Sequence, residues 1–230
     1  MVQKLDIQGL DEGERRVRDP TTGRNVVVPG DMTYQEWEKG KRAEGKSAGG
    51  GAVYPGKPGK VGSVDFSNKD NVKNALNKAE DELQGLKHEV NYSITTDGSI
   101  WRVDGYEDTV NPGAIPVSLK GSYSYHNHPG VKTNYSFSAE DTAFFISEGE
   151  SYSRASDDIF DYEMRRTEQT VEKSYDEVYH RFWEIYKSQT LQKAWDGEID
   201  IDLDGYHETM KVISREYAFE YERSLKNVSR

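Results

Sequence analysis

Apolar and polar positions follow two different periods along this chain, and the periods separate helical from extended segments. Between residues 71 and 86, apolar side chains recur every three or four positions, which predicts a helix with one buried face. Alternating segments flank Asp97 and Gly98, a dipeptide typical of a tight β-hairpin. The expected strands of this middle region are 89–95, 99–103, 115–119 and 123–128.

The second half of the chain repeats this order. A helix is expected to begin at Ser138, and a second hairpin to pair residues 152–155 with 159–164. From residue 171 onward, two amphipathic segments are joined by an acidic stretch, which predicts a C-terminal helical hairpin. Helices that alternate with groups of strands predict an α+β fold, three-layer and α/β-like, with helices packed on a mixed, curved sheet.

Changes in composition divide the chain. The first 45 residues are polar and rich in turn signals, with a short strand expected at 26–28 and a helix capped by Thr33. A stretch rich in Gly and Lys follows, which is typical of a flexible linker. The expected boundaries are 1–45 for an N-terminal piece, 46–63 for the linker, 64–166 for the central domain and 167–230 for the helical hairpin.

Composition narrows the chemistry available. The net charge of −11 argues against a protein that coats nucleic acid, so no nucleic-acid partner is expected. The chain has no apolar run of membrane-spanning length and no signal-peptide core at its start, so neither a membrane partner nor secretion by a signal peptide is expected. With no cysteine, a transition-metal site must use His, Asp and Glu.

The segment His126-Asn127-His128-Pro129 carries the strongest chemical signal. Alternate side chains of a strand share a face, so both histidines can point at one metal ion. Asp141, near the start of the following helix, can supply a third ligand, and two His with one carboxylate suit a hydrolytic zinc site. Ser138 and Asp141 also fit a helix capping box, and taken alone that interpretation is the stronger one.

A hydrolytic metal also needs a general base. Glu89 is the best-placed candidate, because it begins the strand after the first helix and can lie beside the histidine strand. The alternative is that Glu89 is a solvated residue at a strand start.

These residues together resemble the JAMM/MPN zinc metallopeptidases over roughly residues 64–166. The resemblance implies a cytidine-deaminase-like sheet layout and hydrolysis of peptide or isopeptide bonds in a peptide or protein substrate. One departure is that eight residues separate Pro129 from Ser138, one more than is usual. Carried over to this chain, the acid/base would be Glu89, the oxyanion helper Ser138, and the zinc ligands His126, His128 and Asp141.

A second resemblance covers residues 14–37. The segment Arg18-Asp19-Pro20-Thr21-Thr22-Gly23-Arg24 and the run from Val28 to Trp37 are similar to the C-terminal end of phage Mu F-like minor head (head morphogenesis) proteins. This resemblance implies a phage or prophage protein, located in the virion or the bacterial cytoplasm, with phage head or portal proteins as possible partners.

Two other functions stay open. The chain can be a non-catalytic, head-associated binding module that has the fold of the enzyme but not its activity. It can also be a metal-dependent nuclease effector, since His126-Asn127-His128 spells the name of a nuclease class, although the acidic balance argues against this. The acidic series Asp200, Asp202 and Asp204 imitates the start of a calcium loop, but Lys211 stands where the bidentate Glu belongs, and a solvated loop is expected.

Overall fold

The computed structural model describes residues 14–18, 25–29, 57–129 and 135–226. The chain divides into two compact units, residues 1–53 and 54–230, and each is described by itself. In the first unit, strands β1 (Glu14–Arg18) and β2 (Asn25–Pro29) pair in antiparallel fashion. This pairing confirms the strand expected at 26–28, whereas the helix expected from Thr33 lies outside the described residues.

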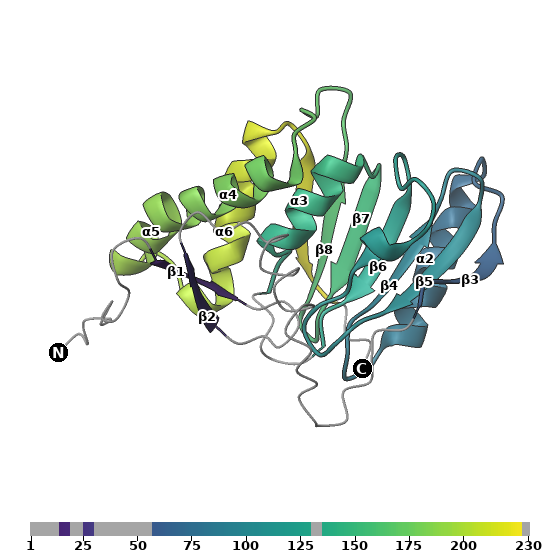
Figure 1. Ribbon diagram of the computed structural model, residues 1–230, viewed down its shortest axis with the longest axis horizontal. Helices are drawn as coiled ribbons and strands as arrows, with labels where there is room; N and C mark the ends of the chain where they lie inside the picture. The colour runs from purple at the N-terminus through teal and green to yellow at the C-terminus, as the bar shows by residue number, and fades with distance from the viewer. Residues whose placement is uncertain (1–13, 19–24, 30–56, 130–134, 227–230) are drawn as a thin grey trace. The chain divides into compact units, whose positions relative to one another are not determined.

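The second unit contains a seven-stranded sheet in the order β3-β5-β4-β6-β7-β8-β9 (Figure 1). Neighbouring strands are antiparallel except for β6 and β7, which are parallel. The sheet is therefore mixed, as the sequence predicts. Its strands are β3 (Gly59–Ser63), β4 (Val90–Ile94), β5 (Ser99–Asp104), β6 (Tyr123–Asn127), β7 (Tyr152–Ser156), β8 (Phe160–Arg165) and β9 (Glu220–Leu225).

Helices cover both faces of this sheet, which confirms the α+β class. On one face, Leu76 and Leu83 of the first helix, α2, pack against Ile94 and Tyr125. On the other face, a larger core joins the remaining long helices to β7, β8 and the segments beside them. The helices are α2 (Lys69–Leu83), α3 (Ala139–Glu148), α4 (Tyr175–Ile185), α5 (Leu191–Trp195) and α6 (Ile201–Glu216), with a 3₁₀ turn η1 (Pro112–Ala114) and a π-helical turn η2 (Tyr186–Thr190).

The strand expected at 115–119 is wrong. This segment follows η1 and runs without strand pairing, while Ile115 and Leu119 insert into a small core beside β5. Its alternating pattern imitates a strand, but Pro116 has no amide hydrogen to give a ladder, and a preceding proline at 112 favours a tight turn. The period of two therefore comes from two buried anchors, Ile115 and Leu119, with the exposed Val117 between them.

The two long helices expected near the C-terminus are present as α4 and α6. The prediction extends the second helix too far. The apolar period runs on through Tyr217 to Tyr221, yet α6 stops at Glu216 and Ala218 adopts a left-handed backbone with φ of 55°. The chain then reverses into β9, which pairs with β8 along six residues. Residues 220–225 were missed because an edge strand with one partner and mostly exposed side chains carries little apolar alternation.

Two further observations bear on the expected boundaries. The last five residues of the expected linker, Gly59–Ser63, form β3 and pair with β5. Residues 167–226 belong to the same compact unit as the sheet, to which they add β9. Within the described part of the chain, no helix is both long and apolar enough to span a bilayer.

Candidate metal centre

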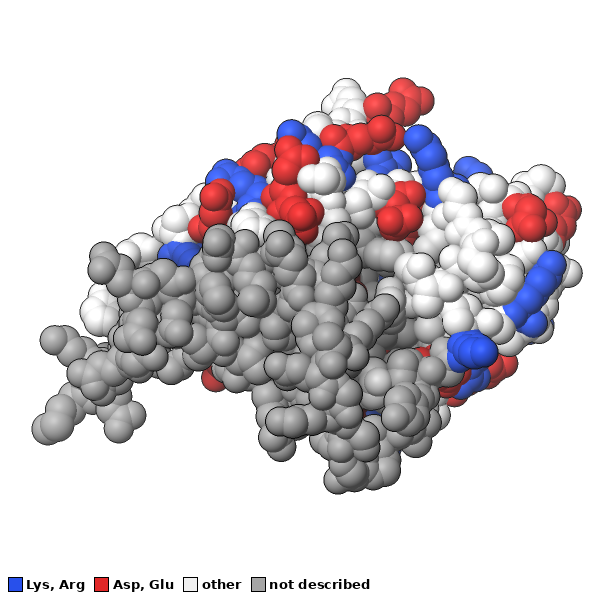
Figure 2. Space-filling model, in the orientation of Figure 1, with Lys and Arg blue, Asp and Glu red and all other residues white. Residues whose placement is uncertain are grey.

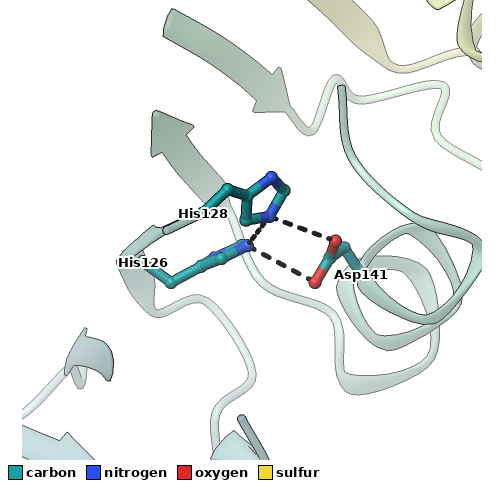
Figure 3. Close-up of side chains that lie close together, drawn as sticks. All are labelled: His126, His128 and Asp141. Atoms are coloured by element: carbon teal, nitrogen blue, oxygen red, sulfur yellow. Dashed lines mark hydrogen bonds and ion pairs between the residues drawn. The ribbon is translucent and has the colours of Figure 1, made fainter. Parts of the chain in front are cut away.

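The two histidines of β6 and its end point the same way, as strand alternation predicts. His126 and His128 are 5% and 7% exposed, and both turn their Nε2 atoms toward Asp141 (Figure 3). The strand leaves the sheet after Asn127, but the amide of His128 still donates to the carbonyl of Ser156 on β7 at 2.8 Å. That bond keeps the backbone of His128 beside β7, so its side chain stays on the same face as that of His126.

Asp141 is positioned by the start of α3. Ser138 is the N-cap: its hydroxyl oxygen accepts a hydrogen bond from the Asp141 amide at 3.1 Å, and the Asp141 Oδ2 atom accepts from the Ser138 amide at 2.8 Å. The Ser138 hydroxyl also lies 2.7 Å from that Oδ2 atom. The capping box predicted from the sequence therefore exists, and it leaves the Oδ1 atom facing His126.

The donor atoms fit one small cation. The two Nε2 atoms are 2.9 Å apart, His126 Nε2 is 3.4 Å from Asp141 Oδ1, and His128 Nε2 is 3.7 Å from Asp141 Oδ2. Ligands about 2.0–2.1 Å from a tetrahedral zinc ion are separated by about 3.3 Å, which lies within this spread. Hence the buried group can hold a metal ion.

The electrostatics favour the protonation states that ligate metals. Burial lowers the pKa of both imidazoles, and in His128, whose pKa falls to about 4, the neighbouring His126 adds to the effect. Burial opposes ionisation of Asp141, but the two histidines and the Ser138 hydrogen bonds hold its pKa below the usual value. Neutral imidazole and ionised carboxylate are the forms required for coordination.

Aromatic rings enclose the histidines, whereas the carboxylate side is more open. The ring of Phe137 lies 5.9 Å from that of His126, and the ring of Tyr162 lies 5.7 Å from that of His128. The Asp141 side chain keeps 23% of its area exposed. Asp141 is therefore the least buried of the three side chains.

The strand register sets the start of β4 beside the strand that carries the histidines. In the antiparallel pairing of β4 and β6, Asn91 lies opposite His126. Glu89 precedes β4 and His128 follows β6, each two residues beyond this pair and outside the paired strands. Glu89 is half-buried and its backbone is held by Gly105 and Tyr106.

Three polar groups near the centre were not found from the sequence. Asn127 points away from the two histidines and bonds to the backbone at the start of β4. Glu150, just after the C-cap of α3, is 2% exposed, and burial raises its pKa to about 8. The Tyr221 hydroxyl joins His207 of α6 to Ser136, two residues before Ser138. The only sequence signal among them is the Asn between the histidines.

The calcium-loop imitation is resolved by α6. Asp200 is the N-cap of that helix, and its Oδ1 atom accepts from the amides of Asp202 and Leu203. The Oδ1 atom of Asp204 accepts from Arg223 at 2.6 Å. The acidic series thus starts a helix instead of forming the solvated loop expected, because Asp at an N-cap and in the first turn stabilises a helix.

Comparison with known proteins adds nothing to this geometry: the chain matches no protein-family model, no curated protein and no solved structure. The resemblances to JAMM/MPN peptidases and to phage head proteins therefore stay predictions.

Proposed function

We propose that the chain is a zinc-dependent hydrolase of peptide or isopeptide bonds, with a JAMM-like centre built from His126, His128 and Asp141. The observation that carries the proposal is the convergence of two buried imidazoles and one carboxylate: the two Nε2 atoms are 2.9 Å apart, and they lie 3.4 Å and 3.7 Å from the Asp141 oxygens. Three protein ligands leave a fourth position for substrate or water, as in catalytic rather than structural zinc sites. A bound zinc ion would supply Lewis-acid polarisation of the scissile carbonyl and acidify a water molecule.

Glu89 is the proposed acid/base. Its carboxylate would take a proton from the attacking water and deliver it to the leaving amine. The support is the register of β4 against β6, in which Asn91 pairs with His126. Glu89 and His128 each lie two residues beyond that pair, so continued strand alternation would put their side chains on the same face. A carboxylate there is separate from the ligand set, so it can work on the proton without leaving the metal.

Ser138 is the proposed oxyanion helper. Its hydroxyl lies next to Asp141, and so next to the centre, but its present partner is the Asp141 carboxylate. To donate to a substrate oxygen, the hydroxyl would have to rotate away from Oδ2. The same residue also holds Asp141 in place, so both roles act through one side chain.

The phage setting is part of the same proposal. The chain would be a phage or prophage protein of the virion or bacterial cytoplasm, its N-terminal unit resembling the end of a minor head protein and its second unit carrying the enzyme. The rival function is a non-catalytic, head-associated module. A nuclease is less well supported, because basic and acidic side chains intermingle on the face shown in Figure 2 and no basic groove is visible among the described residues there.

The test starts with metal content. The full chain, purified without chelator, should carry one zinc ion by elemental analysis. It should also cleave a component of a quenched fluorescent peptide library, or of a matching library with isopeptide bonds to the lysine ε-amine. Glu89→Gln should keep the zinc and lose turnover by roughly 100-fold or more. Zinc without cleavage of either library would favour the binding module, and plasmid cleavage that depends on His126 would favour the nuclease.

A further inference from the structure

Asn127 has a position that the proposed ligands and acid/base do not explain. It stands between the two histidines on β6, and strand alternation turns its side chain to the opposite face. The side chain is 6% exposed. A buried amide is stable only when its donor and acceptor are both satisfied, so its partners identify its role.

Both partners are backbone atoms at the start of β4. The Asn127 Oδ1 atom accepts from the amide of Val90 at 2.8 Å, and the Nδ2 atom donates to the carbonyl of His88 at 3.0 Å. Because one partner can only donate and the other can only accept, the orientation of the amide is fixed. These two contacts lie on either side of Glu89.

Glu89 itself is held from the other side. Its amide donates to the Tyr106 carbonyl at 2.6 Å, and its carbonyl accepts from the Gly105 amide at 2.8 Å. The backbone pairing of β4 with β6 ends at Asn91 and His126. Beyond that pair, the Asn127 side chain connects the backbone on both sides of Glu89 to the histidine strand.

We propose that Asn127 is a positioning residue that sets Glu89 at its working distance from the centre formed by His126, His128 and Asp141. The inference rests on the proposed function, since it assumes the acid/base role of Glu89. A general base must be placed within a fraction of an ångström of the proton it removes, and a misplacement of 1 Å can cost about 100-fold in rate. A primary amide supplies the acceptor and the donor that these two contacts need.

The experiment compares the zinc-loaded full chain with two variants. Asn127→Leu removes both contacts at similar volume, and Asn127→Asp keeps the acceptor for Val90 but sets an oxygen against the His88 carbonyl. Thr190→Val is the matched control, because it deletes a buried hydrogen bond to Thr209 that does not bracket Glu89. Amide exchange at Val90, zinc stoichiometry, kcat and KM are measured, the last two on the library peptide that wild type cleaves.

In Asn127→Leu, the Val90 amide hydrogen should exchange at least about tenfold faster than in wild type. The variant should keep one zinc ion, and its kcat should fall roughly 10- to 100-fold with KM unchanged. Asn127→Asp should fall between that variant and wild type, and it carries the test if the Leu variant does not fold. Thr190→Val should keep the wild-type kcat.

Two results would overturn the inference. One is wild-type kcat in Asn127→Leu despite faster exchange at Val90, and the other is loss of zinc, which would place Asn127 in support of the ligands. Absence of cleavage by wild type is distinguishable from both results, because it removes the proposed function and the inference with it. Amide exchange at Val90 would still show whether Asn127 holds the backbone on both sides of Glu89.

Discussion

Asp141 has two separable tasks, and zinc-dependent stability can tell them apart. Its Oδ2 atom caps α3 through Ser138, and its Oδ1 atom faces His126 at 3.4 Å. Asp141→Asn keeps an oxygen for the cap but removes the charge that a cation needs. Ser138→Ala does the reverse, since it removes the cap hydroxyl and leaves the carboxylate. The two variants change neighbouring atoms of one capping box.

The magnitudes follow from the two roles. Zinc at 100 times its dissociation constant stabilises the folded chain by about 2.7 kcal/mol. For a unit of this size, each kcal/mol shifts Tm by about 2–4 °C, so zinc should raise the wild-type Tm by about 5–11 °C. Loss of an N-cap hydroxyl costs about 1 kcal/mol, so Ser138→Ala should lower the zinc-free Tm by about 2–4 °C and keep the zinc shift.

The assay is thermal unfolding in the presence of EDTA and then of a zinc titration. In Asp141→Asn the zinc shift should shrink to within about 2 °C of zero, less than one kcal/mol of metal stabilisation. A full shift in Asp141→Asn would refute the assignment of Asp141 as a ligand. Equal loss of the shift in Ser138→Ala would mean that cap geometry, and not the carboxylate charge, governs binding.

Two further predictions concern pH. Burial raises the pKa of Glu150 from 4.5 to about 8, so its folded form holds a proton that the unfolded form releases, and stability falls as pH rises from 4.5 to 8. Glu150→Gln should therefore gain stability relative to wild type between pH 5 and 8 in urea unfolding, and a constant difference would contradict this. Burial, with Arg223 and Lys211, lowers the pKa of His207 to about 4, so stability is lost as pH falls from 6.5 to 4. His207→Gln should flatten that loss, and an unchanged acid slope would show that His207 does not cause it.

The local patterns of the sequence determined most elements of the second unit. Apolar spacing predicted a helix over 71–86 and the structure has one at Lys69–Leu83. The Asp97-Gly98 turn predicted the β4–β5 hairpin, and Gly98 adopts the positive φ of 81° that such a turn requires. These signals are reliable because their cause is local: a residue and its near neighbours decide the backbone. The capping box at Ser138 is predictable for the same reason.

Elements whose stability comes from distant partners were not predictable in this way. The strand β9 forms because β8 offers a free edge, and its own residues are mostly exposed. The segment 115–119 shows the converse case, in which a strand-like pattern comes from two anchors placed in a separate core and an exposed valine between them. Local pattern and tertiary requirement conflict at both places, and the tertiary requirement prevails.

For the site, the sequence by itself determined that His126 and His128 share a face, because a strand has a period of two. It did not determine that Asp141 reaches them, since that depends on how α3 packs on the sheet. The register of β4 against β6 sets Asn91 opposite His126, and long-range pairing alone fixes such a register. The two hydrogen bonds from Asn127 to the backbone on either side of Glu89 join the end of β6 to the start of β4. Because these segments are far apart in the sequence, only the tertiary structure could reveal the bonds.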